Sequence, residues 1–226
     1  MTDLAAADEA TESVSTIGDH PAGIDSSTAP AAEGSETKGE RTRRRLLEIA
    51  IDRFGSRGYR ATSVSEIARA AGLTQAASYA YFENKEALFR AAVDADASAL
   101  IDEVSAQVAG VPPRHLIPSV IVYALAALDQ HPLARRVLSG LEPDEVPRLV
   151  GLPALERFGR LLAEQIAMGR ETGEIRADLD PDKLAGGLES LILGVLFNTV
   201  LSGGRAQARH IDGVVEAFDL MIRPSP

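Results

Sequence analysis

Residues 62–90, TSVSEIARAAGLTQAASYAYFENKEALFR, contain the signals for two short helices joined by a tight turn. Ser63 is a candidate N-cap, and Glu66 three residues later is placed to complete a capping box. Gly72 tolerates the positive φ that a tight turn between helices needs. Thr74 is an N-cap candidate for the second helix. This order predicts a helix-turn-helix, whose second helix can enter the major groove of DNA.

Five pieces of this stretch occur together and in order: Thr62-Ser63-Val64, Ile67-Ala68, Ala70-Ala71-Gly72-Leu73-Thr74, Tyr79-x-Tyr81-Phe82 and Asn84-Lys85-Glu86-x-Leu88. Over roughly residues 40–90 they resemble the TetR family of bacterial regulators. Ser78 and Ala80 depart from the family pattern, which usually has a branched apolar residue and a large aromatic there. The departures put the packing of the small domain and one phosphate contact in doubt.

The remaining chain reads as a series of helices without strands, so we expect an all-α fold. The resemblance implies an N-terminal three-helix helix-turn-helix DNA-binding domain and a C-terminal helical domain for ligand binding and dimerisation. The helices expected from apolar spacing, caps and prolines cover residues 38–55, 85–108, 117–130, 133–141, 154–172, 181–201 and 207–222. The expected divisions are a disordered acidic tail (1–36), the DNA-binding domain (37–84) and the effector-binding and dimerisation domain (85–226).

The composition is that of an aliphatic helical protein, with 45% apolar residues, 4% aromatic residues and no cysteine, so disulfides and thiolate chemistry are excluded. We expect no membrane span, because Glu189 and Asn198 interrupt the longest apolar run. No signal peptide is visible in the acidic N-terminus. These features predict a cytoplasmic protein.

The net charge of −10 is unevenly distributed. Residues 1–36 contain eight acidic and no basic side chains, whereas residues 37–90 contain eleven basic and six acidic ones. Because binding depends on the field where phosphates lie, this local positive charge is compatible with DNA as the partner.

Double-stranded DNA is therefore the first expected partner. Gln75 is the predicted base reader, because a glutamine amide can bond adenine N6 and N7 together. Basic and hydroxyl side chains nearby are expected to meet phosphates. The predicted DNA-binding residues are Arg43, Arg44, Thr62, Ser63, Thr74, Gln75, Ala76, Tyr79, Tyr81 and Lys85.

An apolar small-molecule effector is the second expected partner. The resemblance places its pocket between the helices at 85–108 and 154–172, and Tyr123 is a candidate polar handle. The predicted ligand-binding residues are Val93, Leu100, Val122, Tyr123, Phe158 and Leu162.

A second copy of the chain is the third expected partner. The segment 181–201 is apolar nearly all round and carries small residues on one face, so it either forms a subunit interface or closes over other helices of its own chain. The predicted dimerisation residues are Gly187, Ser190, Leu191, Gly194, Phe218 and Ile222.

Signatures of catalysis are absent from the sequence. The four histidines lack metal-ligand spacing, and neither a GxSxG motif nor a phosphate-binding or dinucleotide-binding glycine loop occurs. We therefore expect no enzyme activity, no metal and no cofactor. The expected function is a ligand-responsive transcriptional repressor that binds a near-palindromic operator as a homodimer. The alternative is a helical small-molecule-binding or adaptor protein whose basic face binds DNA non-specifically.

Overall fold

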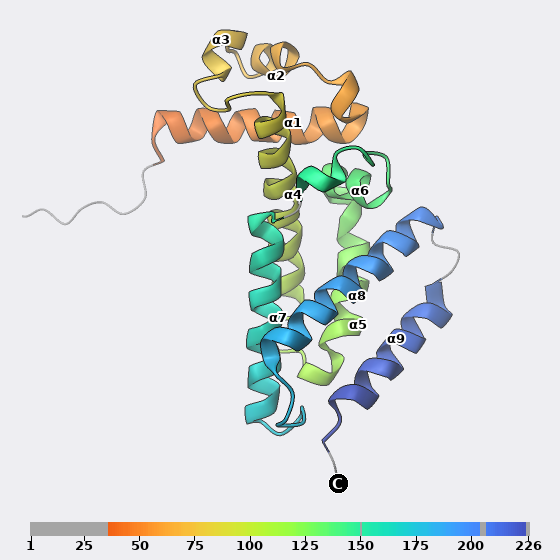
Figure 1. Cartoon of the computed structure of the whole chain (residues 1–226). Coiled ribbons are helices and arrows are strands. Elements are labelled where there is room, and N and C mark those ends of the chain that lie inside the picture. The colour runs from red at the N-terminus through yellow and green to blue at the C-terminus, as the bar shows by residue number, and fades with distance from the viewer. Residues whose placement is uncertain (1–35, 150, 204–206, 225–226) are drawn as a thin grey trace, which may run out of the picture. The chain divides into compact units, whose positions relative to one another are not determined.

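The computed structural model describes residues 36–149, 151–203 and 207–224, and every regular element in these ranges is helical (Figure 1). The prediction of an all-α fold is confirmed. The expected acidic tail, residues 1–36, lies outside the described residues apart from Glu36.

The N-terminal part contains α1 (Lys38–Ala61), α2 (Val64–Ala70) and α3 (Gln75–Ser78). Thr37 and Glu40 form a reciprocal capping box at the start of α1. Helix α1 extends six residues beyond its predicted end at Gly55 and is broken at Gly58, where φ is 85°. Only glycine adopts this conformation readily, so the chain turns sharply there.

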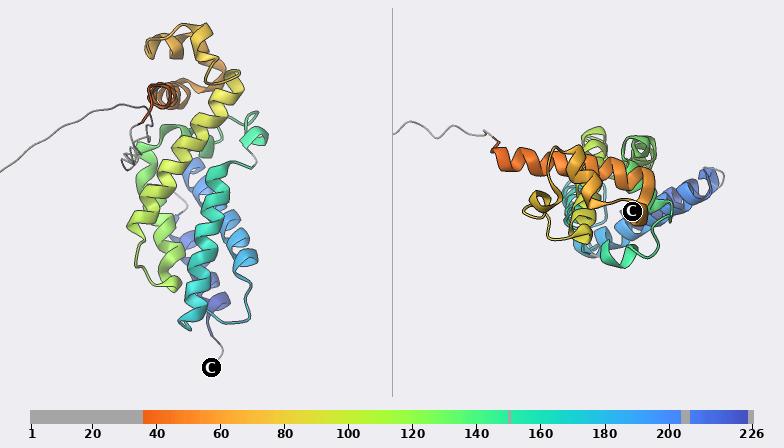
Figure 2. Two further views of the ribbon diagram at one scale, coloured as in Figure 1. Left: turned by 90° about the vertical axis from the view of Figure 1, so that its left-hand side faces the viewer. Right: turned by 90° about the horizontal axis from the view of Figure 1, so that it is seen from above.

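Within the described residues, the C-terminal part contains six α-helices and two short 3-10 turns. Their bounds are α4 (Lys85–Gln107), α5 (Pro113–Ala127), η1 (Leu128–Gln130), α6 (Pro132–Leu138), η2 (Val146–Leu149), α7 (Pro153–Glu171), α8 (Pro181–Leu201) and α9 (Gln207–Ile222). Helix α4 leads away from the helix-turn-helix and lies beside α5 and α7, while α8 crosses them and α9 lies against α5 (Figures 1 and 2). Both predicted proline breaks, after residue 110 and at His131-Pro132, are found.

Two apolar cores share α4. The N-terminal core joins α1 and α2 to the first turns of α4, and Phe54 meets Phe89 edge to face at 5.1 Å. The C-terminal core is formed by α4, α5, α7, α8 and α9. Burial of these aliphatic side chains is the main favourable contribution to folding, at roughly 25 cal/mol per Å² of apolar surface.

Helix α6 links the two cores through buried polar contacts. Asp96 of α4 accepts hydrogen bonds from the backbone N–H groups of Leu133 and Ala134, at 2.9 and 2.8 Å, and so satisfies the first turn of α6. Gly55 of α1 lies so close to Pro132 that a β-carbon built on it would fall 2.9 Å from the proline Cβ. The start of α6 is therefore fixed against both α1 and α4.

Candidate DNA-binding surface and ligand cavity

The helix-turn-helix is built from the caps that the sequence predicts. Ser63 Oγ accepts from the Glu66 N–H at 3.3 Å, and Thr74 Oγ1 accepts from the Ala77 N–H at 3.1 Å. Gly72 has a φ of 77° in the turn between the helices. The Glu66 carboxylate does not complete the capping box, since it pairs with Arg57 of α1 at 3.5 Å.

Helix α3 presents a small exposed surface. Gln75, Ala76 and Tyr79 are exposed, and Gln75 Nε2 donates to the Tyr79 hydroxyl at 3.1 Å. Ser78 is buried, and its hydroxyl donates to the Gln75 carbonyl at 2.7 Å. A serine thus occupies the inward position without leaving its oxygen unpaired.

Thr62 is a correction to the predicted DNA-binding set. Its side chain is buried, and Oγ1 donates to the carbonyls of Gly58 at 2.8 Å and Arg53 at 3.1 Å. These carbonyls lie beside the break in α1, where regular helix bonding is interrupted. The hydroxyl therefore closes the end of the helix and is buried away from the surface.

The basic residues predicted to contact phosphates lie on α1 and at the start of α4, and two of them pack over aromatic rings. The Arg43 guanidinium lies 5.0 Å from the Phe82 ring centre, and Lys85 Nζ lies 4.5 Å from that of Tyr59. Arg44 pairs with Glu36 at 3.0 Å, and the Arg44 side chain is largely exposed while that of Glu36 is partly exposed. Exposed pairs contribute only about 0–1 kcal/mol, so a phosphate can replace such a partner at little cost.

Two tyrosines flank this surface differently. Tyr79 is 44% exposed, whereas Tyr81 is half-buried and packs against the N-terminal core. Its predicted role as a phosphate contact stays a prediction, as do those of Arg43, Arg44 and Lys85.

Gln75→Ala tests the base-reading role. Loss of a bidentate contact to one base is expected to weaken operator binding by about 1–3 kcal/mol and to relax the preference at one base pair. The measurement is affinity for an operator and its single-base variants. Gln107→Ala, at the exposed far end of α4, is the matched control. Unchanged affinity and base preference for Gln75→Ala would remove Gln75 from the reading surface.

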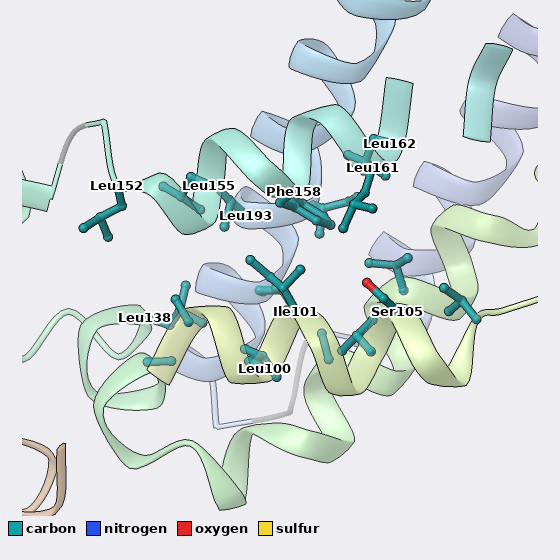
Figure 3. A pocket seen from close by; sticks show the side chains of 18 of the residues that line it. Leu100, Ile101, Ser105, Leu138, Leu152, Leu155, Phe158, Leu161, Leu162 and Leu193 are labelled. Carbon is teal, nitrogen blue, oxygen red and sulfur yellow. The ribbon is translucent and has the colours of Figure 1, made fainter. Parts of the chain in front are cut away.

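A cavity of about 730 Å³ lies between α4 and α7 and is also lined by residues of α5, α6 and α8 (Figure 3). Four predicted ligand-binding residues line it: Val93, Leu100, Phe158 and Leu162. Such a volume is typical of small-molecule sites. The walls are almost entirely aliphatic, so the cavity favours an apolar occupant.

Val122 and Tyr123 are corrections to the predicted cavity. They are 55% and 38% exposed and do not line it. Helix α5 directs Val120 and Ala124 into the cavity, and the next two positions after Val120 point away because successive residues are rotated by about 100°. Tyr123 is therefore not the polar handle.

The polar side chains of the cavity are Ser105 and Gln165, which the sequence analysis missed. Each lies four residues after an apolar lining residue, Ile101 and Leu161, and so shares that residue's helix face. This spacing was a usable signal, but it becomes informative only once the inward faces of α4 and α7 are known.

The outer face of α8 is apolar and largely exposed, although Gly194 and Phe197 on it also line the cavity. Gly187, Ser190, Leu191 and Gly194 are exposed, and nothing lies within 4 Å of a β-carbon built on either glycine, while the role of these residues in an interface stays a prediction. Phe197 and Leu201 continue the same face at 42% and 55% exposure. We call this the α8 outer face: Gly187, Ser190, Leu191, Gly194, Phe197 and Leu201.

Helix α8 also proves long and apolar enough to cross a membrane by length and composition, in spite of Glu189 and Asn198. Core helices of soluble proteins pass the same test. Glu189 lies against α7, where its carboxylate is 3.1 Å from a β-carbon built on Gly159, and burial raises its pKa. The charge is thus turned away from the α8 outer face.

Phe218 and Ile222 are corrections to the predicted interface. They are 3% and 1% exposed and pack in the C-terminal core of their own chain. Leu220 and Met221 of the same helix are 62% and 42% exposed. The amphipathic pattern of α9 marked the face that closes the monomer.

Comparison with known proteins agrees with this architecture. Residues 46–92 match the family model for bacterial regulatory proteins of the tetR family. The transcriptional repressor DhaR of Mycobacterium sp. (strain GP1) is 32% identical over 147 residues, which span 63% of this chain and 74% of that protein. The uncharacterized HTH-type regulator YdgC of Bacillus subtilis (strain 168) is 46% identical over 54 residues, 24% of this chain and only 28% of that protein.

The transcriptional regulator FadR from Bacillus subtilis, solved in complex with stearoyl-CoA, has the same fold with a TM-score of 0.61 and 20% identity over 80% of this chain and 99% of that one. The repressor relative is matched over most of its own length, and the helix-turn-helix coincides with the family model. This chain belongs to the TetR family of transcriptional regulators, whose members are not enzymes.

Proposed function

We propose that this protein is a repressor that binds a near-palindromic operator as a homodimer and is released from it by an apolar small molecule. The proposal depends on three residues that the N-terminal core and the cavity have in common. Val93, Leu149 and Leu152 pack in that core and also line the cavity. A ligand in the cavity therefore touches side chains that hold the DNA-binding domain in place.

The DNA-binding half of the proposal is supported by the exposed face of α3 and the basic side chains around it. Gln75, Ala76 and Tyr79 offer a base-reading surface, while Arg43 and Lys85 supply positive charge near it. Two such domains related by a two-fold axis fit two half-sites about 34 Å apart or a multiple of this. A near-palindromic operator follows from that symmetry.

The release half is supported by the tight contact between α1 and α6. Ala134, Val137 and Leu138 of α6 line the cavity, and Pro132 at the start of the same helix abuts Gly55 of α1. A ligand that prefers a shifted α4 and α6 disfavours the spacing of the domains on DNA. It lowers operator affinity by the size of that preference.

Repression is supported by the relative DhaR, which is itself described as a repressor. The structural neighbour FadR was solved with stearoyl-CoA, which supports an apolar chain as part of the effector. Neither comparison identifies the effector of this chain.

Selection of genomic fragments by the purified protein, followed by footprinting, tests the proposal. We expect protection of a near-palindrome and loss of binding when either half-site is scrambled. Protection that depends only on fragment length, with no sequence preference, would instead support the alternative function, an adaptor protein whose basic face binds DNA non-specifically. Scrambled flanking DNA of equal length serves as the control.

A further inference from the structure

The cavity has an uneven distribution of polarity. None of the described residues that line it is charged, and Ser105 and Gln165 supply its polar side chains. Neither of these side chains hydrogen-bonds to another residue in the described part of the chain. Ser105 directs its hydroxyl toward the space between α4 and α7 (Figure 3). Both groups are thus available to a ligand.

Ser105 and Gln165 lie at the same level of the cavity. Helices α4 and α7 run side by side in the same direction, and the Asp94 carboxylate accepts from the Ala154 N–H at 2.8 Å (Figure 2). Ser105 follows Asp94 by eleven residues, and Gln165 follows Ala154 by eleven. At 1.5 Å per residue both lie about 16 Å from that contact, in the half away from the DNA-binding domain.

The opposite end is wholly apolar. Val93, Leu149, Leu152 and Leu155 line it, and all four pack in or against the N-terminal core. Along α4 the lining runs from Val93 to Val108, a distance of about 22 Å. The volume is roughly five times that of a 150 Å³ cavity that holds one benzene, so it has room for an alkyl chain of about a dozen or more carbons.

A charged head group finds no partner in this cavity. Arg157, the cation next to Phe158 on α7, already pairs with Asp102 at 2.7 Å and donates to the Ser98 carbonyl at 2.9 Å. Residues 85–226 carry fourteen basic and twenty acidic side chains, so their overall field also disfavours an anion. An unpaired charge among apolar walls loses its hydration without compensation.

We propose that the effector is an uncharged, elongated molecule with one hydroxyl or carbonyl group at one end. The polar group bonds Ser105 and Gln165, and the apolar body extends toward Val93 and Leu152. That the bound molecule acts as an effector rests on the proposed function, whereas its binding to the cavity does not. The proposed ligand class excludes coenzyme A thioesters and carboxylates as the preferred ligands, although the fold neighbour FadR was solved with stearoyl-CoA.

Displacement of the uncharged dye Nile red from the full-length protein tests this ligand class at pH 7, with three probes of equal chain length. We expect 1-dodecanol to displace the dye at a concentration at least tenfold below that needed for dodecanoate or dodecanoyl-CoA. Equal or tighter binding of either anion overturns the inference, as does failure of 1-dodecanol to displace the dye.

Ser105→Ala and Gln165→Leu test the placement of the polar group. Each substitution is expected to weaken the binding of 1-dodecanol by about three- to tenfold, the range for the loss of one net hydrogen bond. Binding of 1-chlorododecane, which offers no comparable hydrogen-bonding group, should stay unchanged in both variants. An equal loss for both probes indicates a packing role, and no loss for either removes the two residues from the site.

The matched control is Gln107→Ala on the exposed side of α4, and the melting temperature of every variant checks folding. Because this assay contains no DNA, its failure is separable from failure of the proposed function. Binding of 1-dodecanol without release from the operator contradicts the proposed function and leaves the ligand class intact. Release from the operator by an anion that binds more tightly than the alcohol contradicts the proposed ligand class and leaves the proposed function intact.

Discussion

Gly187→Glu is expected to convert the protein into a folded monomer with about 10²- to 10⁴-fold lower operator affinity, because each half-site is then bound without its neighbour. Gly187 lies on the α8 outer face but does not line the cavity, and a β-carbon there meets nothing within 4 Å. In a two-fold interface the substitution introduces two charges into one apolar contact. The monomer itself has room for the side chain.

The reason to expect an interface is the apolar surface that the chain leaves uncovered. Phe197 and Leu201 on α8 and Leu220 and Met221 on α9 are each more than 40% exposed. Apolar side chains left exposed in this way on two helices favour an association site. A stable dimer needs at least about 1,000 Å² of buried surface, which two helices from each subunit can supply.

Light scattering, circular dichroism and operator titration on one preparation measure the outcome. Ala106→Glu, at an exposed position of α4, is the matched control and should remain dimeric. Glutamate has a higher helix propensity than glycine, so unfolding of Gly187→Glu cannot be attributed to the helix itself. Unfolding would mean that the patch packs within the chain, and a wild-type monomer at micromolar concentration would end the dimer hypothesis.

Local signals in the sequence were sufficient to predict most helices. Caps such as Thr74 and Asp180, and breaks such as Pro132, act through the backbone of adjacent residues, so they can be read without knowing the fold. The cavity walls on α4 and α7 were also predicted in part, since Leu100 and Phe158 follow helical apolar spacing.

The wrong predictions concern residue types that are common in two different environments. Thr62 looked like a surface hydroxyl beside a recognition helix, but a broken helix end nearby supplied two carbonyl acceptors. Phe218 looked like an interface aromatic, but the same apolar periodicity describes a helix that closes its own core. Periodicity shows that a face is buried and does not show which molecule buries it.

The contacts around α6 depend on residues distant in sequence. Glu142 Oε1 accepts from the Tyr59 N–H at 3.2 Å across 83 positions, and it pairs with Arg136 at 2.5 Å. Asp96 of α4 similarly accepts a hydrogen bond from the backbone of α6, 37 positions away. Neither arrangement has a local pattern, so the sequence alone predicted only that this region is loop or short helix.

Gly58→Ala is expected to lower the free energy of unfolding of the DNA-binding domain by about 3–5 kcal/mol. The backbone at Gly58 has φ 85° and ψ 169°, a region that costs other residues about 1–3 kcal/mol. A β-carbon would also fall 2.5 Å from Arg136 Nη2 and 2.5 Å from Glu142 Oε1. The partly buried Arg136–Glu142 pair must then shift or separate. Loss of one partner of a fully buried pair costs about 3–5 kcal/mol, so displacement of this pair adds a smaller loss to the backbone strain.

Gly173→Ala separates backbone strain from this collision. Gly173 has φ 76° and nothing within 4 Å of an added β-carbon, so only the left-handed conformation contributes, about 1–2 kcal/mol. Denaturant unfolding gives the two losses, and amide hydrogen exchange locates them. For Gly58→Ala, faster exchange should concentrate in α1 and α2, because the Tyr59 N–H loses its acceptor and the contact between α1 and α6 is weakened. Equal losses for the two variants would show that the Arg136–Glu142 pair adjusts without cost and does not hold the DNA-binding domain to α6.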